Sequence, residues 1–436
     1  MAGAFENCYL AATMDARALL IGSFHAAVGA ADPLKILPQH LPQPPEGKTL
    51  VVGAGKAAAS MALAVEQHWP AAAPLDGLVI TRYQHGLLTN RIKVIEAGHP
   101  VPDESGEKAA REILRRVKTL SPKDLLLVLI SGGGSSLLSL PADGISMDEL
   151  KATTRELLRC GAPIQDMNTV RKHLSGIQGG RLAAACKAQV LALIVSDVTG
   201  DDPTHIGSGP CAPDPTTYRD ALDIFERFGV KAPTGVMEHL QRGARGEIAE
   251  TPKPGDKLFL RVDNRVVASS QGALQAAATY FRGKSVTPLV LGDSVTGEAS
   301  EVAKVYAALA RQIRQYGEPF TTPVALISGG ECTVTVRGNG RGGRCSEFLL
   351  SLAIDLDGFA GTHALACDTD GIDGSEDNAG ALLAPDTLAR ARALSLSAKQ
   401  LLANNDGYSF FAALGDLVVT GPTRTNVNDY RVIIVL

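Results

Sequence analysis

The 436-residue sequence lacks any arrangement of cysteines that would build a disulfide framework or a structural zinc site. Its seven cysteines are scattered, their number is odd, and none forms a C-x-x-C pair. Scattered thiols of this kind are typical of proteins from a reducing compartment. The sequence also lacks an uninterrupted apolar stretch long enough to cross a bilayer. We therefore expect a cytoplasmic protein that makes no membrane contact.

An excess of charge of either sign is missing as well: 42 Lys and Arg residues stand against 46 Asp and Glu residues, for a net charge of −4. Without a basic excess the chain lacks the electrostatic footprint of a nucleic-acid binder, so no nucleic-acid partner is expected. The G-x-S-x-G elbow is absent, which leaves a serine hydrolase triad without support. The hydrophobic content of 45% is that of an ordinary globular protein, and many of the 45 glycines cluster in short loops.

Short apolar runs, each followed by a glycine-rich turn and a helical segment, indicate an α/β fold with a parallel sheet covered on both faces. These runs are residues 50–53, 77–81, 124–130, 190–195, 288–292, 323–327 and 362–367. A chain of this length is expected to form two domains. The segment 231–257 is rich in Pro, Gly and charge, so we expect domains over residues 1–240 and 241–436. Ligands of such sheets bind beyond the carboxyl ends of the strands, where the glycine-rich loops lie.

The turn Gly53-Ala-Gly55-Lys56-Ala-Ala58 formally matches the G-x-G-x-x-[GA] dinucleotide fingerprint. The acidic residue expected at the end of the next strand is absent, because Thr81-Arg82-Tyr83 stands there. The turn is not a P-loop either, since Lys56 is followed by Ala57. What remains is a lysine at a helix N-terminus, where the side chain and the helix dipole both favour an anion. The alternative is a plain strand–helix turn with a surface lysine.

Two further loops have the composition of anion-binding sites. Ser131-Gly132-Gly133-Gly134-Ser135-Ser136 offers backbone N–H groups and hydroxyls that can form a nest for phosphate or carboxylate oxygens. A tight connector is the alternative, but it seldom needs three consecutive glycines. The segment 328–344 is rich in glycine, which allows close approach of a ligand, and contains three arginines, whose planar forks suit the same oxygens. A flexible, solvated basic loop is the alternative there.

Carboxylates follow several of the predicted strands. Asp197 comes just past a buried run, and such a group can hold Mg²⁺ or take a proton from a substrate hydroxyl. One of the two residues behind it, Asp201 and Asp202, is expected to cap a turn. Asp293 is a second strand-end carboxylate and a further metal candidate.

Three more aspartates, Asp368, Asp370 and Asp373, recur on a glycine-containing loop. They lack the bidentate Glu of an EF-hand, so a contribution to Mg²⁺ binding and plain turn chemistry both remain open. His99 is a lone histidine in the proline-containing segment Gly98-His-Pro-Val-Pro102, for which a structural role is favoured.

The ordered set of these motifs resembles the glycerate 2-kinase family, whose C-terminal half is called the MOFRL domain. The resemblance runs over nearly the whole chain, and the set is far more specific than any one of its members. The matching segments are residues 52–57, 98–103, 130–136, 196–202, 207–210, 214–217, 328–331, 333–337, 342–344, 368–371 and 415–423.

The resemblance implies a Rossmann-like parallel-sheet N-terminal domain and a smaller α/β C-terminal domain, with the active site in the cleft between them. It implies a kinase that uses ATP and Mg²⁺ to phosphorylate the 2-hydroxyl of D-glycerate, giving 2-phosphoglycerate and ADP. Carried over by motif, Lys56 is a catalytic lysine, Asp197 a catalytic or metal-linked carboxylate, and Arg344 the arginine that stabilises the transferring phosphoryl group. The residues expected to bind ATP or its phosphates are Gly53, Gly55, Ser131, Gly132, Gly133, Gly134, Ser135, Gly329, Gly330 and Glu331.

This chain departs from the family pattern after Gly-Gly-Arg, where Cys345-Ser346 replaces the usual Asn-Gln pair. The replacement puts substrate or nucleotide contacts at that place in doubt. Family members often carry the label hydroxypyruvate reductase, and an NAD(P)H-dependent hydroxypyruvate reductase is the alternative function, based on the G-x-G-x-x-A turn and on Arg82 as a contact for a 2′-phosphate. A non-catalytic sensor of sugar acids or phosphate is a third reading, and a homodimer is left open.

Overall fold

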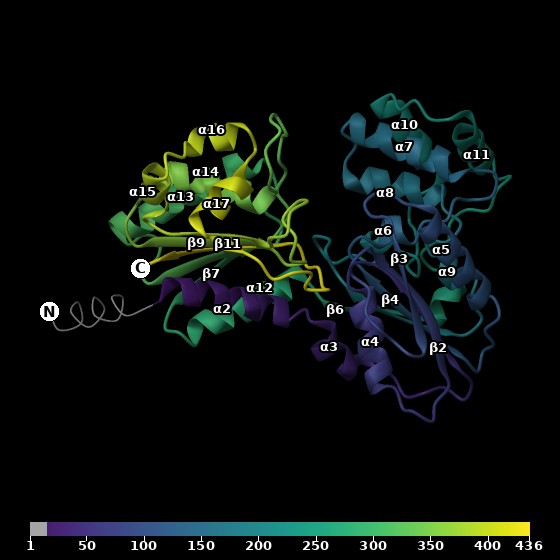
Figure 1. Cartoon of the computed structure of the whole chain (residues 1–436). Coiled ribbons are helices and arrows are strands. Elements are labelled where there is room, and N and C mark those ends of the chain that lie inside the picture. The colour runs from purple at the N-terminus through teal and green to yellow at the C-terminus, as the bar shows by residue number, and fades with distance from the viewer. Residues whose placement is uncertain (1–14) are drawn as a thin grey trace. The chain divides into compact units, whose positions relative to one another are not determined.

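The computed structural model describes residues 15–436, which form two compact units of α/β structure (Figure 1). One unit, here called the N-terminal unit, comprises residues 33–267. The other, the C-terminal unit, combines residues 268–436 with the preceding segment 15–32. No helix within residues 15–436 is both long enough and apolar enough to cross a membrane.

The N-terminal unit is built on a six-stranded sheet in the order β3-β2-β1-β4-β5-β6. Its strands are β1 (Thr49–Ala54), β2 (Leu75–Arg82), β3 (Ile92–Ala97), β4 (Leu125–Ser131), β5 (Gln189–Val195) and β6 (Val262–Ala268). Strands β1 to β5 pair in parallel, and every residue of β1 and β4 is buried. The parallel sheet predicted from the continuous apolar runs is therefore confirmed, because only strands covered on both faces can be apolar throughout.

Helices cover both faces of this sheet. Alternate β1 residues, Leu50 and Val52, share a core with Ile113 of α5 (Glu104–Val117), while α4 (Ala58–His68) contacts β2 and β4. A second small core joins α7 (Met147–Arg159), α8 (Ile164–His173), α10 (Tyr218–Phe228) and α11 (Thr234–Ala244), which lie together in Figure 1. The remaining short helices of this unit are α3 (Pro33–Ile36), α6 (Gly134–Leu137), α9 (Arg181–Ala184) and the 3-10 turns Leu37–His40, Ile206–Ser208 and Lys257–Arg261.

The C-terminal unit contains a mixed sheet in the order β11-β10-β9-β12-β8-β7. Its strands are β7 (Thr287–Gly292), β8 (Val324–Ser328), β9 (Thr362–Asp368), β10 (Gly380–Leu383), β11 (Leu417–Val418) and β12 (Asp429–Val435). Only β7 and β8 pair in parallel; β12 runs antiparallel to both β8 and β9, between which it lies. This last strand of the chain is buried throughout, so it completes the core of the sheet.

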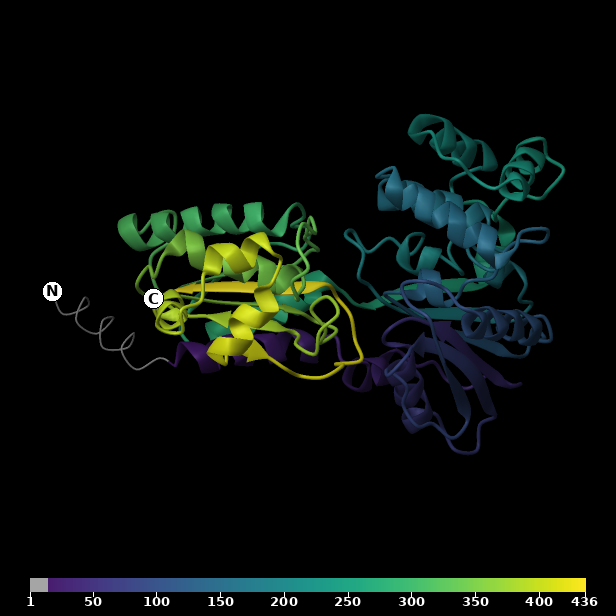
Figure 2. The same ribbon diagram turned by 45° about the horizontal axis from the view of Figure 1, so that its top comes forward.

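Helices α2 (Ala16–Gly29) and α12 (Ser270–Arg282) lie on one face of the mixed sheet (Figure 1 and Figure 2). This pair packs closely, since a Cβ atom on Gly22 would lie 2.1 Å from the Tyr280 hydroxyl oxygen. The helices on the opposite face are α13 (Ala299–Tyr316), α14 (Arg344–Leu356), α15 (Thr387–Ala393), α16 (Ala398–Ala403) and α17 (Gly407–Leu414).

The units differ from the predicted domains 1–240 and 241–436 at both ends of the N-terminal unit. The segment 241–267 belongs to that unit because it leads into β6, which pairs with β5. Two contacts also hold it there: His173 Nε2 lies 3.4 Å from Glu250 Oε2, and Lys253 Nζ donates to the Thr216 carbonyl oxygen. Residues 15–32 join the C-terminal unit, where Tyr430 donates a hydrogen bond to Ser23 Oγ at 2.9 Å. A charged, Pro-rich composition does not reveal such contacts.

Candidate active site

The N-terminal unit brings three of the predicted loops to one edge of its sheet. Strands β1, β4 and β5 are neighbours, with Ala54 beside Ile130 and Ser131 beside Val195. The loops that follow therefore leave the sheet at the same level. The chain order reverses between β1 and β4, and this reversal is where parallel α/β sheets bind their ligands.

The first two loops are hydrogen-bonded to each other. The Lys56 N–H donates to the Gly132 carbonyl at 2.8 Å, and the Ala57 N–H donates to Ser131 Oγ at 3.0 Å. Gly55 N–H donates to the Ile80 carbonyl of β2 at 3.1 Å, and Gly53 lies within β1 itself. Helix α4 begins two residues after Lys56, so the predicted place of this half-buried lysine at a helix N-terminus is confirmed. Lys56 thus lies beside the triple-glycine turn.

The triple-glycine turn needs glycine at its middle position. Gly133 has φ = +80°, and a Cβ atom there would lie 2.9 Å from His99 Nε2 and 3.5 Å from Lys56 Cγ. Gly132 and Gly134 flank it, and the hydroxyl of Ser135 is hydrogen-bonded to Ser208 Oγ at 2.8 Å. His99, to which the sequence assigned a structural role, therefore borders the same turn as Lys56.

Replacement of Gly133 by alanine is expected to lower both stability and activity. The left-handed backbone alone costs about 1 kcal/mol for a non-glycine residue, and the added methyl group would lie 2.9 Å from His99 Nε2, so the His99 ring must move. Gly144→Ala is the matched control, because Gly144 has φ = +87° but its Cβ would meet nothing within 4 Å. Thermal melting should show a loss of stability in both variants, because both place alanine in a left-handed backbone. Steady-state kinetics should show a loss of kcat/KM in Gly133→Ala alone. Equal kinetics in the two variants would contradict a role for this turn.

The third loop of this edge carries Asp197, two residues after β5 and half-buried. The prediction that one neighbouring aspartate caps a turn is confirmed for Asp202, whose Oδ1 accepts a hydrogen bond from the Thr204 N–H at 2.9 Å. Asp197 therefore follows the strand next to the triple-glycine loop, at the same edge of the sheet as Lys56.

In the C-terminal unit the parallel pair β7 and β8 presents Asp293 and the Gly329–Glu331 turn together. Gly292 is beside Ser328, and the Gly329 N–H donates to the Gly292 carbonyl at 2.9 Å. Gly330 has φ = +92°, and a Cβ atom there would lie 2.4 Å from the Val295 nitrogen. This glycine is therefore required by contact with the chain itself. Asp293 is half-buried, and a Cβ on Gly329 would lie 3.4 Å from its Cα.

Arg344, the first residue of α14, is surrounded by carboxylates. Its Nε donates to Asp429 Oδ1 at 2.8 Å and its Nη2 to Asp368 Oδ2 at 2.7 Å, while Nη1 lies 3.0 Å from Glu331 Oε1. Burial disfavours the charged guanidinium, but Asp429, Asp368 and Glu331 outweigh burial and raise the pKa of Arg344. Glu331 is more than half exposed, whereas the two aspartates are almost fully buried. Glu331 is thus placed as a partner of Arg344.

The aspartate loop 368–373 positions the start of α14. Asp373 is fully buried and accepts hydrogen bonds from the backbone N–H groups of Cys345 and Ser346, both at 2.9 Å. A carboxylate at this place satisfies otherwise unpaired helix N–H groups. Asp373 thus fixes the backbone of the two residues that follow Arg344, while Asp368 fixes the guanidinium of Arg344 itself. Sequence reasoning left this loop open between metal binding and turn chemistry; the structure places it as the support of Arg344.

The departure Cys345-Ser346 lies beneath the site and away from its surface. Both side chains are buried, and Ser346 Oγ is hydrogen-bonded to the backbone of Gly343 at 3.1 Å. Neither residue lines the cavity that adjoins Arg344. The replacement of the family's amide pair therefore changes the packing of the α14 N-terminus.

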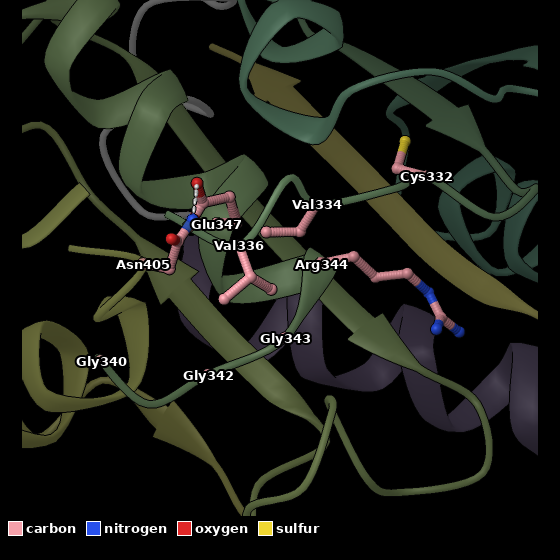
Figure 3. Close-up of a pocket in the computed structure, with 9 residues that line it drawn as sticks. All are labelled: Cys332, Val334, Val336, Gly340, Gly342, Gly343, Arg344, Glu347 and Asn405. Carbon is pink, nitrogen blue, oxygen red and sulfur yellow. Dashed lines mark hydrogen bonds between the residues drawn. The ribbon is translucent and has the colours of Figure 1, made fainter. Parts of the chain in front are cut away.

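A cavity of about 240 Å³ opens beside Arg344 (Figure 3). Val334 and Val336 supply apolar lining, and Glu347 and Asn405 point toward each other, with Asn405 Nδ2 donating to Glu347 Oε1 at 3.2 Å. The Arg344 guanidinium extends away from this pair. The volume is below the range of about 300–1,000 Å³ for complete small-molecule sites, so it suits a fragment of a larger ligand.

Glu347 was missed as a site residue by sequence reasoning. Its spacing of three residues from Arg344 would place both on one face of a helix, which is the signal that could have identified it. Burial raises the pKa of Glu347 to about 7, although the Asn405 hydrogen bond acts in the other direction. The carboxyl group therefore changes charge close to neutral pH.

Stability is expected to fall as the pH rises through the titration of Glu347. The folded pKa lies above the ordinary value of 4.5, so the folded state binds the proton more tightly and is favoured at low pH. As the pH rises from 4.5 to about 7, the free energy of unfolding therefore falls by about 1–3 kcal/mol. Urea unfolding of the wild type and Glu347→Gln at pH 5, 6, 7 and 8 should show this fall in the wild type alone. Parallel pH profiles would contradict it.

The described residues offer no preformed cage for a metal ion, since no group of three His, Cys, Asp or Glu side chains within residues 15–436 is placed to hold one. Magnesium in phosphoryl-transfer sites usually takes one or two carboxylates plus phosphate oxygens and water. Asp197 and Asp293 each fit this requirement as single strand-end carboxylates. Asp368 and Asp429 fit it less well, because Arg344 already pairs with them.

Comparison with known proteins agrees over nearly the whole chain. Residues 19–241 match the domain of unknown function DUF4147, and residues 324–429 match the MOFRL family. A protein of Agrobacterium vitis that carries the name of a hydroxypyruvate reductase is 48% identical, covering 97% of this chain and 95% of that protein. The glycerate 2-kinase of Pyrococcus horikoshii is 38% identical, covering 97% and 98% respectively.

Among solved structures, that of a glycerate kinase from Thermotoga maritima superimposes with a TM-score of 0.85 at 36% sequence identity, covering 95% of this chain and 98% of that one. The α/β fold of this chain is thus shared with a protein of that name. The chain belongs to the DUF4147–MOFRL family, which includes the glycerate kinases.

Proposed function

We propose that this protein transfers the γ-phosphoryl group of ATP to the 2-hydroxyl of D-glycerate, giving 2-phosphoglycerate and ADP. The observation that supports this chemistry is the contact between two loops of the N-terminal unit. The Lys56 N–H donates to the Gly132 carbonyl oxygen, and the Lys56 side chain borders the turn at Gly133. Such a combination of cation and close backbone approach suits phosphate oxygens. The glycerate 2-kinases and glycerate kinases among the relatives support the substrate.

The proposed roles follow from the chemistry of each residue. Lys56 and Arg344 offset negative charge on the transferring phosphoryl group, the largest contribution in this class of reaction. Asp197 orients the 2-hydroxyl and accepts its proton. Gly53, Gly55, the Ser131–Ser135 turn and the Gly329–Gly330 turn contribute close backbone approach to ATP, with Glu331 holding Arg344.

Magnesium, when bound, would neutralise phosphate oxygens of the nucleotide, and Asp197 and Asp293 are each a carboxylate that could contribute to holding it. These two carboxylates stand as its proposed ligands on the protein. Charge neutralisation by the protein is assigned to Lys56 and Arg344, and proton transfer to Asp197.

A hydroxypyruvate reductase is the second candidate, because a relative 48% identical to this chain carries that name. The dinucleotide fingerprint requires an acidic residue at the end of the second strand to bind the ribose. Here β2 ends at Thr81 and Arg82, so the ribose contact is missing. Arg82 as a contact for a 2′-phosphate is the one feature that favours NADPH.

The deciding experiment runs two assays on one preparation. The first couples ADP release to D-glycerate, ATP and Mg²⁺; the second follows NADPH and NADH oxidation with hydroxypyruvate. The proposal expects glycerate-dependent ADP release and no nucleotide oxidation, with the phosphate on the 2-position by NMR of the product. Oxidation of NADPH or NADH without ADP release would favour the reductase over the kinase. If neither assay shows turnover, a non-catalytic sensor becomes the favoured function.

A further inference from the structure

A second, narrow pocket lies in the N-terminal unit directly behind the triple-glycine turn. Its lining includes Ser135 and Ser136 of that turn, Lys151 of α7 and Arg171 of α8. Gln178, which follows α8 in the chain, lines it as well. Its volume is about 30 Å³. A cavity needs roughly 10–15 Å³ to hold one water molecule, so the pocket admits a group of two or three heavy atoms.

Arg171 carries a positive charge in this pocket without a counter-ion. Among residues 15–436 no carboxylate lies within ion-pairing distance of it, and its guanidinium makes a single hydrogen bond, from Nη1 to Asn168 Oδ1 at 3.3 Å. Burial accordingly lowers the pKa of Arg171. A guanidinium has five N–H donors, and a partly buried cation is costly unless an anion pairs with it. Four donors remain for a ligand.

The pocket is connected to the turn that borders Lys56. Gln178 Nε2 donates to the Ser135 carbonyl at 2.8 Å, which holds the back of the turn in place. Ser208 Oγ is 2.8 Å from Ser135 Oγ and 3.5 Å from Asn168 Oδ1, the same oxygen that accepts from Arg171. An anion held by Arg171 is thus placed against Ser135, at the rim of the site where phosphoryl chemistry is proposed.

From this geometry we infer that the pocket binds the carboxylate of the hydroxy-acid substrate, with Arg171 as its counter-ion and Lys151 as a second cation. The inference rests on the proposed function and adds to it a residue that determines specificity. A carboxylate has the size of the cavity and the two oxygens that a guanidinium fork pairs with. A phosphate of the nucleotide shares this charge, and the experiment separates the two.

The test replaces Arg171 by Gln and measures binding of D-glycerate by calorimetry in the absence of nucleotide, together with KM for each substrate. The expected result is a rise of about 10- to 100-fold in Kd and KM for D-glycerate, the value of a lost charge-assisted pair, with KM for ATP changed less than twofold. Arg155→Gln is the matched control, since Arg155 lies on the neighbouring helix α7, is exposed and does not line the pocket.

If Arg171→Gln does not fold, Arg171→Lys and Lys151→Gln give the same reading, with smaller increases for D-glycerate alone. A rise in KM for ATP in place of D-glycerate would assign the pocket to a nucleotide phosphate and overturn the inference, as would unchanged binding of both. Kinase activity that does not depend on Arg171 would contradict the inference but not the proposed function. Binding of D-glycerate that depends on Arg171 but is not followed by phosphorylation would contradict the proposed function but not the inference.

Discussion

Replacement of Arg344 by alanine is expected to lower kcat by about 10³-fold or more, the range of arginines that stabilise a transferring phosphoryl group. The guanidinium is pre-oriented by Asp368, Asp429 and Glu331, so it needs no reorganisation when charge develops on the phosphoryl oxygens. The measurement is single-turnover kinetics at saturating ATP and D-glycerate, which reports the chemical step apart from product release.

The same substitution is also expected to destabilise the fold. It removes the guanidinium that lies 2.7 Å from the buried Asp368 Oδ2, and removing one partner of a buried ion pair costs about 3–5 kcal/mol. Asp429 retains Arg431 Nη1 at 3.0 Å. Activity must therefore be compared at a temperature where urea unfolding shows the variant to be folded.

Two companion variants separate charge from geometry. Arg344→Lys keeps one positive charge but loses the planar fork, so it should retain more stability than alanine and still lose most of kcat. Arg341→Ala is the matched control on the same loop: Arg341 is exposed, pairs with Glu376 and lies over the Tyr408 ring. Near-normal kcat in folded Arg344→Ala would remove this residue from the mechanism.

Replacement of Lys56 by methionine is expected to lower kcat by about 10²–10³-fold, the effect of losing one pre-oriented group that stabilises developing negative charge. Methionine keeps the length and apolar stem of the lysine, and the backbone bonds of residues 55–57 to β2 and β4 do not involve the side chain. Thermal melting is measured beside kcat, and kcat is compared at a temperature where the variant is folded.

Lys93→Met, on the edge strand β3 and exposed, controls for the loss of one surface charge. Lys56→Arg tests whether a positive charge alone is sufficient beside Gly133; the bulkier fork should recover only part of the activity. If Lys56→Met raises KM for ATP without lowering kcat, Lys56 binds the nucleotide equally in the ground and transition states, and its catalytic role is lost.

Much of the N-terminal unit could be predicted from the sequence because its signals are local. An apolar run followed by glycine and a helical pattern specifies one strand–loop–helix unit, and parallel strands then bring their carboxyl ends to one edge. The positions of Lys56, the 131–136 turn and Asp197 at that edge follow from this rule alone. The register of Ala54 with Ile130 and of Ser131 with Val195 bears it out.

The surroundings of Arg344 could not be predicted in this way. Its two buried partners lie 24 and 85 residues further along the chain, and the second of them, Asp429, starts a strand that inserts antiparallel between β8 and β9. No local pattern reports which distant carboxylates a folded sheet will bring to an arginine. The cap that Asp373 forms on α14 and the contact that requires glycine at 330 are of the same kind.

The sequence by itself determined the α/β class, the parallel sheet and the loops that carry the chemistry, since each depends on hydrophobic periodicity and on glycine within a few residues. Only the tertiary structure decided where the units divide, which aspartates support Arg344, and that Arg171 lies without a counter-ion behind the glycine turn. These features depend on burial and on contacts between distant segments, and both arise only when the sheets and helices pack.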